Sequence, residues 1–257
     1  MSVNVVNSPC DDCAFHNAAQ LKKLGLEVKD ANYVVALAGN PNTGKSTVFN
    51  ALTGLRQHTG NWPGKTVARA EGGFIYGESK YKIVDLPGTY SLLSTSEDEE
   101  VARNFILFGQ PDVTVIVVDA SRLERNLNLA LQVLEITEQA VLCLNLMDEA
   151  KRHGVVVDER ALAKQLGVPV VPTSARTNEG VNRLLDTIHQ VATREIVCKP
   201  HRIKSLPSKI EKAVNELSKE LKNCYPSLPN TRWIAMRLLD GDQRIIKALE
   251  NNEFLAA

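Results

Sequence analysis

One octapeptide near residue 40 has the residue types and the spacing that bind phosphate groups. It consists of Gly39, Asn40, Pro41, Asn42, Thr43, Gly44, Lys45 and Ser46, and it stands between the apolar run YVVALA and the helix-like stretch STVFNALTG. Glycines allow the backbone N–H groups to encircle phosphate oxygens, and the positive end of the following helix points at them. Lys45 is then expected to neutralise the β- and γ-phosphates and Ser46 to ligate Mg²⁺. A strand, this loop and a helix in that order predict a P-loop rather than a chance glycine turn.

A second candidate follows the apolar run from Lys80 to Val84. Its residues are Asp85, Leu86, Pro87 and Gly88. A carboxylate at the end of such a strand can hold a Mg²⁺-bound water, and the Gly88 N–H can meet a γ-phosphate. Asp-x-x-Gly alone is more often a plain turn. Its position after a P-loop favours the γ-phosphate side of a nucleotide site.

Two later segments have the chemistry to recognise a nucleobase. The first is Asn145, Leu146, Met147 and Asp148, and the second is Thr173, Ser174, Ala175 and Arg176. Asp148 can accept hydrogen bonds from N1–H and the N2 amine of guanine, a donor pair that adenine lacks, so it is expected to select guanine. The alternative is an asparagine cap followed by an acidic residue in the first turn of a helix. The second segment is expected to lie against the base with its backbone N–H groups.

The elements that must position these residues alternate between strands and helices. The strands are expected at 34–38, 80–84, 113–118, 141–144 and 168–171, and helices at 123–136 and 179–193. Short apolar runs joined by amphipathic helices predict an α/β fold with a mostly parallel central sheet flanked by helices. After residue 199, four prolines punctuate stretches with helical periodicity, which predicts a small all-helical domain.

Composition narrows the class of protein further. The 257 residues are 44% hydrophobic and 23% charged, which is ordinary for a globular chain and excludes collagenous or disordered classes. A formal net charge of zero argues against non-specific electrostatic binding of nucleic acid, so no nucleic-acid partner is expected. The longest apolar run, 113–118, is far shorter than a bilayer span, and the N-terminus lacks a secretory signal. The expected compartment is therefore the cytoplasm.

The N-terminal extension contains a third chemical cluster, formed by Cys10, Cys13 and His16. Two thiolates and an imidazole could hold a transition metal. Three ligands without a second Cys/His pair are an incomplete structural zinc site, so a chance cluster is the other interpretation.

The motifs in this order resemble those of Ras-like GTPases, and the wider sequence resembles the ferrous iron transport protein B (FeoB) family. The stretches that carry this second resemblance are GNPNTGKSTVFNALTG, GNWPGKTVARAEG, VDLPGTYSL, VVDASRLERNLNLALQ, NLMDEA and RWIAMRLLDGDQRIIKALE. They span about residues 33 to 250. Leu146 stands where most GTPases have lysine, but the FeoB pattern is Asn-x-Met-Asp. The resemblance implies an N-terminal extension (1–32), a GTP-binding G domain (33–199) and a helical spacer domain resembling a guanine-dissociation inhibitor (200–257).

The resemblance also implies roles for individual residues. Lys45, Thr66 and Gly88 would serve catalysis; Ser46, Thr66 and Asp85 would hold Mg²⁺, and Asn42 a K⁺ ion that accelerates hydrolysis. The remaining nucleotide-binding residues would be Thr47, Gly64 and Lys65, beside the motif residues named above. Thr66 belongs to the expected switch I (about 55–67), and switch II covers about 89–100. Because Thr89 stands where many GTPases carry a water-orienting glutamine, slow intrinsic turnover is expected.

The function implied is a GTP-hydrolysing regulatory domain whose GTP or GDP state controls Fe²⁺ uptake at the cytoplasmic face of the bacterial inner membrane. The implied partners are the transporter's own transmembrane portion, a small accessory iron-transport protein and further copies of the chain. Two alternatives stay open: a soluble ribosome-associated GTPase, and a nucleotide-sensing module whose hydrolysis is incidental.

Overall fold

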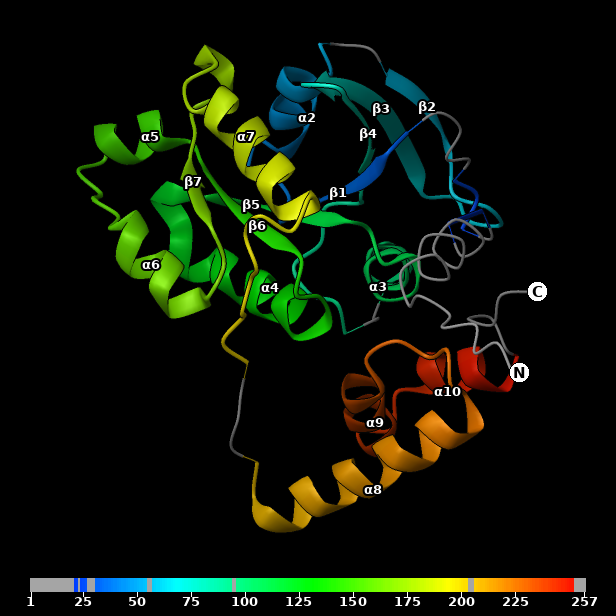
Figure 1. Ribbon diagram of the computed structural model, residues 1–257. Helices are drawn as coiled ribbons and strands as arrows, with labels where there is room; N and C mark the ends of the chain where they lie inside the picture. Colours follow the sequence, from blue (N-terminus) through cyan, green and yellow to red (C-terminus); the bar gives the residue numbers. More distant parts are fainter. Residues whose placement is uncertain are drawn as a thin grey trace, which may run out of the picture.

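Seven strands form one mixed sheet in the order β2-β3-β4-β1-β5-β6-β7 (Figure 1). The computed structural model describes residues 21–22, 24–26, 31–54, 57–93, 96–202 and 206–251. The strands are β1 (Tyr33–Gly39), β2 (Gln57–Asn61), β3 (Ala68–Tyr76), β4 (Ser79–Asp85), β5 (Val113–Asp119), β6 (Ala140–Asn145) and β7 (Val170–Pro172). β4, β1, β5, β6 and β7 run parallel to one another, so their carboxyl ends meet at one edge. Ligands bind at that edge in open α/β sheets.

Helices cover both faces of the sheet, as Figure 1 shows. They are α2 (Lys45–Thr53), α3 (Glu97–Gly109), α4 (Leu123–Ile136), α5 (Met147–Arg152), α6 (Glu159–Leu166) and α7 (Val181–Ala192), with short 3₁₀ turns η1 (Ala120–Arg122) and η2 (Ala175–Thr177). α2 packs against α7, and α3 packs against α4. The strand β5 is buried along its whole length, because helices cover it on both sides. The predicted α/β architecture is confirmed.

The antiparallel edge of the sheet was not predicted from the sequence. β3 pairs antiparallel with β4, and β2 pairs antiparallel with β3, from Gln57 opposite Gly72 to Asn61 opposite Ala68. Residues 57–61, which lie within the segment expected to be switch I (about 55–67), are therefore strand. Its sequence QHTGN is polar and β3 is half-exposed, so neither has the apolar run by which buried strands are recognised.

A separate helical unit follows the sheet and consists of α8 (Ser208–Cys224), α9 (Thr231–Leu239) and α10 (Gln243–Glu250). α9 packs against both other helices. The Asn230 amide, at the start of α9, donates to the carbonyls of Glu135 and Ile136 at the end of α4, at 2.8 and 3.0 Å. Arg202 adds a bond from Nε to the Leu134 carbonyl at 2.9 Å.

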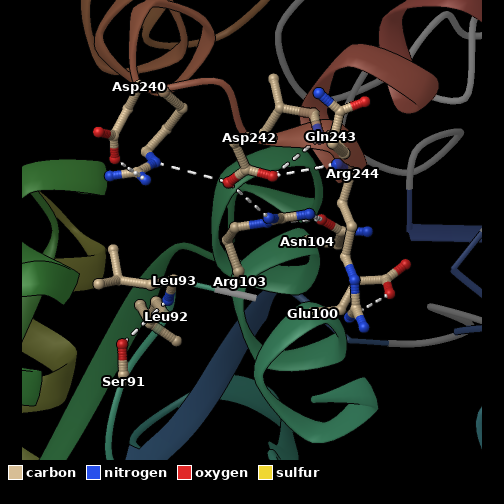
Figure 2. A network of polar contacts seen from close by, with 12 residues as sticks. Ser91, Leu92, Leu93, Glu100, Arg103, Asn104, Asp240, Asp242, Gln243 and Arg244 are labelled. Carbon is tan, nitrogen blue, oxygen red and sulfur yellow. Dashed lines mark hydrogen bonds and ion pairs between the residues drawn. The ribbon is translucent and has the colours of Figure 1, made fainter. Parts of the chain in front are cut away.

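A buried arginine forms a second junction between α3 and the helical unit (Figure 2). The Arg103 side chain is 1% exposed, and its guanidinium lies 3.5 Å from the Asp242 carboxylate. Burial lowers the pKa of Arg103, and the charges of Asp242 and Glu100 oppose that shift. The other oxygen of Asp242 caps α10 by accepting from the N–H groups of Arg244 and Ile245. One carboxylate therefore both starts α10 and meets the buried cation of α3.

Candidate functional site

The P-loop residues form a tight turn between β1 and α2. At Gly39 a Cβ atom would lie 2.6 Å from the Val117 carbonyl oxygen, so β5 leaves room only for glycine. Gly44 has φ 76°, and a Cβ there would lie 2.5 Å from the Asn145 amide nitrogen. Asn42 also has a positive φ, 65°. This geometry places the first N–H groups of α2 beside the loop, as phosphate binding requires.

Lys45 joins the P-loop to the end of β4. Its ammonium group contacts the Asp85 carboxylate and donates to the Leu86 carbonyl at 2.7 Å. Burial raises the pKa of Asp85, and the charge and hydrogen bond of Lys45 oppose that shift. The predicted phosphate-neutralising lysine and the predicted Mg²⁺ ligand are therefore neighbours.

The segment after Asp85 lies against the P-loop. Gly88 packs on Pro41, and the Thr89 N–H donates to the Gly39 carbonyl at 3.3 Å. Thr89 is buried. The residue that stands where many GTPases carry a glutamine is therefore packed inside the protein.

The base-side residues are joined by one buried amide. Asn145, which is 1% exposed, donates to the Thr43 carbonyl at 3.0 Å and accepts from the Ala175 N–H at 3.1 Å and the Thr173 hydroxyl at 3.2 Å. The Asp148 N–H donates to the Ser174 hydroxyl at 3.2 Å. The P-loop, the end of β6 and the segment after β7 are thus held in one fixed arrangement.

Asp148 stands in the first turn of α5, after Leu146 in a left-handed conformation and Met147. Its carboxylate is 28% exposed and lies 3.3 Å from Arg176 and 3.8 Å from Arg152. A partly exposed carboxylate on this fixed frame can accept from a pair of donors on a base. Asp148 is an acidic residue in the first turn of α5, but the asparagine cap of the alternative interpretation is absent: the N-cap is Leu146, no side chain caps this helix, and the Asn145 amide bonds Thr43, Thr173 and Ala175 instead.

The predicted switch I residues lie toward α3. Thr66 is exposed, and its hydroxyl donates to Glu97 at 3.3 Å rather than to a group of the P-loop. Lys65 lies 3.3 Å from Glu100. Gly64 has φ 66°, and the neighbouring Trp62 is buried with its ring 5.4 Å from that of Phe105. The carboxylates of Glu97 and Glu100 had no predicted partner, because nothing in the sequence pairs a loop with a helix 31 to 35 residues away.

The residues present fit a guanine nucleotide with Mg²⁺. The Asn40 side chain is 2% exposed, and neither of its polar atoms has a hydrogen-bond partner within the described part of the chain. Such orphaned groups are uncommon in native interiors and mark strain or a missing partner. Ser46 is exposed and follows Lys45 in the first turn of α2, and Lys45 contacts Asp85. A hydroxyl with a carboxylate is the hard oxygen donor set that Mg²⁺ prefers.

The N-terminal cluster of Cys10, Cys13 and His16 lies outside the described residues. Within the described residues, no group of three or more His, Cys, Asp or Glu side chains is arranged to hold a metal ion. The helices that the structure describes include none long and apolar enough to cross a bilayer.

Comparison with known proteins defines the family. Residues 33–188 match the model of ferrous iron transport protein B, and residues 207–257 match that of the FeoB cytosolic helical domain. The chain belongs to the FeoB family, which confirms the resemblance read from its motifs.

Two curated relatives are similar over most of this chain. The Fe(2+) transport protein A/Fe(2+) transporter FeoB fusion protein of Porphyromonas gingivalis is 39% identical over 94% of this chain and 29% of its own length. The Fe(2+) transporter FeoB of Salmonella typhimurium is 40% identical over 81% of this chain and 27% of its own length. The chain therefore spans less than a third of these relatives.

The fold also matches a solved structure. The cytosolic domain of the T. maritima FeoB iron transporter in a GMPPNP form is 38% identical, with a TM-score of 0.77 over 84% of each chain. The same domain in a GDP form gives a TM-score of 0.76.

Proposed function

We propose that this chain binds GTP, hydrolyses it to GDP and phosphate, and thereby regulates ferrous iron uptake by a larger transporter. The observation that supports this best is the meeting of the P-loop, Asp85 and Asp148 at one edge of the sheet. The family match adds support, because the T. maritima domain is described in GDP and GMPPNP forms.

Each part of the site has a separate task in this proposal. The N–H groups of residues 40–44 and the Lys45 ammonium bind the phosphates, so Lys45 leaves Asp85 when nucleotide arrives. Ser46, Asp85 and, after a movement of switch I, Thr66 would hold Mg²⁺, which would neutralise charge on the phosphates. Asn42 is the proposed ligand of K⁺. Asp148 accepts from N1–H and N2–H of guanine, beside the backbone of residues 174–176.

Hydrolysis breaks the bond between the γ-phosphorus and the oxygen that bridges it to GDP. Water supplies the new oxygen on phosphorus; one of its protons stays on the inorganic phosphate, and the other passes to a phosphate oxygen or to solvent. The Gly88 N–H and Lys45 stabilise negative charge that develops on the phosphoryl oxygens. The buried Thr89 leaves the water without the usual orienting glutamine, so the intrinsic rate is slow.

The proposed partners follow from the family. The remaining portion of a FeoB transporter would place this chain at the cytoplasmic face of the bacterial inner membrane, with the helical unit passing the nucleotide state onward. A small accessory iron-transport protein is a second proposed partner, since one relative is a fusion with an Fe(2+) transport protein A. A homo-oligomer is a third.

Single-turnover GTP hydrolysis with Mg²⁺, measured in K⁺ and in Na⁺, tests the proposal. We expect faster turnover in K⁺, loss of that difference in Asn42→Ala, and weakened GTP binding in Asp148→Asn. Equal slow rates in both salts would overturn K⁺ activation and favour a partner-activated switch. An absence of guanine-nucleotide binding would overturn the proposed function as a whole.

A further inference from the structure

The carboxylate of Glu100 contacts two parts of the molecule that are far apart in the sequence. Its Oε1 lies 3.3 Å from the Lys65 ammonium, next to Thr66. Its Oε2 accepts from the Arg244 guanidinium of α10 at 2.8 Å, a pair drawn in Figure 2. One side chain in the first turns of α3 therefore touches both switch I and the helical unit.

A second carboxylate in the same turn holds the neighbouring switch residue. Glu97 accepts from the Thr66 hydroxyl at 3.3 Å. Glu97 and Glu100 are three residues apart, so they lie on one face of α3. Two consecutive loop residues, Lys65 and Thr66, thus each contact one of two carboxylates on a single face of α3.

The contact of Glu100 with Arg244 of α10 is shorter than its contact with Lys65, 2.8 Å against 3.3 Å. The Glu100 side chain is 19% exposed, against 31% for Lys65 and 34% for Arg244. The same Arg244 nitrogen also donates to the Ser96 carbonyl at 2.8 Å. Partial burial strengthens such pairs relative to fully exposed ones. Because Arg244 makes two bonds of 2.8 Å at the start of α3 and Lys65 makes one contact of 3.3 Å with Glu100, Lys65 is the more easily released partner of Glu100.

We propose that Glu100 is a coupling residue that links the position of switch I to the helical unit, and that Glu97 and Glu100 together hold Lys65 and Thr66 in a resting position. The part that concerns nucleotide rests on the proposed function. When Thr66 moves toward Mg²⁺, Lys65 leaves Glu100, whose ion pair with Arg244 then loses the competition of this lysine. Because linkage is reciprocal, the helical unit must in turn bias the choice between GTP and GDP.

Hydrogen exchange on the nucleotide-free protein tests the link without any assumption about nucleotide. Lys65→Ala removes the competitor for Glu100, so amide exchange in residues 243–250 should slow by about 2- to 5-fold, the size of a partly exposed ion pair. The same substitution in a Glu100→Ala background should change exchange there by less than about 1.5-fold. Lys80→Ala, an exposed lysine on β4, and Asp98→Ala, which removes a charge from the same turn of α3, are the matched controls.

An effect of Lys65→Ala on α10 that is equal with and without Glu100 would overturn the link, and so would no effect in either background. A thermal melt of each variant shows whether it is folded. The conservative Glu100→Gln substitution removes the charge while keeping the size of the side chain, so it should reproduce the effect of Glu100→Ala.

A second experiment tests the part of the proposal that concerns nucleotide. It compares the ratio of the Kd values for Mg²⁺-GMPPNP and GDP between the wild type and the variants. Glu97→Ala and Glu100→Ala should each shift the ratio toward the triphosphate by about 2- to 5-fold, since they release the resting position. An unchanged ratio would overturn the resting-position part. If neither nucleotide binds while the exchange result holds, the proposed function fails and the Glu100 link stands.

Discussion

The two sides of the candidate nucleotide site are held by different kinds of interaction. On the base side, the buried Asn145 amide joins three segments through three hydrogen bonds. On the switch side, the exposed Thr66 hydroxyl rests on Glu97 through one bond of 3.3 Å. Water does not compete for buried bonds as it does for exposed ones, so the first side is rigid and the second is easily displaced.

This difference separates recognition from switching. A rigid base side can select a nucleotide without moving, whereas a weakly held switch side can respond to the presence of a γ-phosphate. The helical unit contacts α3, which belongs to the switch side, and it also contacts the end of α4. Four substitutions test the comparison, beginning with the largest expected effect.

Asn145→Ala should damage the rigid side most. It leaves the Thr43 carbonyl and the donors of Thr173 and Ala175 without their buried partner, so the free energy of unfolding should fall by about 2–4 kcal/mol. Urea denaturation measures this. Asn182→Ala, on the exposed side of α7, is the control and should cost less than about 0.5 kcal/mol. Equal costs for the two variants would mean that Asn145 does not join the segments.

Asp148→Asn should change which base the rigid side accepts. Losing a charged acceptor should weaken GDP binding by about 10- to 100-fold. The new amide can donate to the extra carbonyl of xanthine, so xanthine nucleotides should bind better than they do to the wild type. Fluorescence titration with labelled nucleotides measures both. The neighbouring Glu149→Gln serves as a control, and GDP affinity that stays at the wild-type level in Asp148→Asn would refute guanine selection by this carboxylate.

Thr66→Ala should affect the switch side alone. Its hydroxyl is expected to reach Mg²⁺ only with the triphosphate, so Mg²⁺-GMPPNP affinity should fall by about 2- to 10-fold while GDP affinity is unchanged. Calorimetric titration separates the two ligands. Thr59→Ala, an exposed threonine of β2, controls for loss of a hydroxyl. Parallel losses for both nucleotides would show that Thr66 is part of the fixed frame.

The pH dependence of stability should show the smallest effect, through Asp85. Burial raises its pKa above the ordinary 3.8. At pH values near and between the unfolded and folded pKa values, the folded protein therefore binds more protons than the unfolded chain. The free energy of unfolding contributed by Asp85 therefore falls as pH rises through the interval between the two pKa values. Urea denaturation from about pH 4 to about pH 7 should show this decline for the wild type relative to Asp85→Asn. A difference that is constant or rises with pH would contradict the raised pKa.

The strand ends could be predicted because each follows a recognisable apolar run. Asp85 and Asn145 are the last residues of β4 and β6, and Asp148 stands just beyond β6 at the same edge of the sheet. The range of α4 was predicted without error, because apolar residues recur through it at helical spacing.

Contacts between charged residues far apart in the sequence could not be predicted. Lys65 meets Glu100, and Arg103 meets Asp242, across chain separations that no periodicity encodes. The antiparallel edge formed by β2 and β3 was missed because its residues are polar or half-exposed. Burial patterns thus indicate where elements lie, but not which charged side chains meet.

Hydrogen exchange of the wild-type protein with GDP and with Mg²⁺-GMPPNP tests the central claim most directly. The account predicts a change in protection at residues 57–67 and 96–100, carried to 243–250, with residues 140–150 and 170–176 protected alike in both states. Equal protection in the two states along the whole described chain, or a change as large on the base side, would contradict a rigid recognition side joined to a movable switch side.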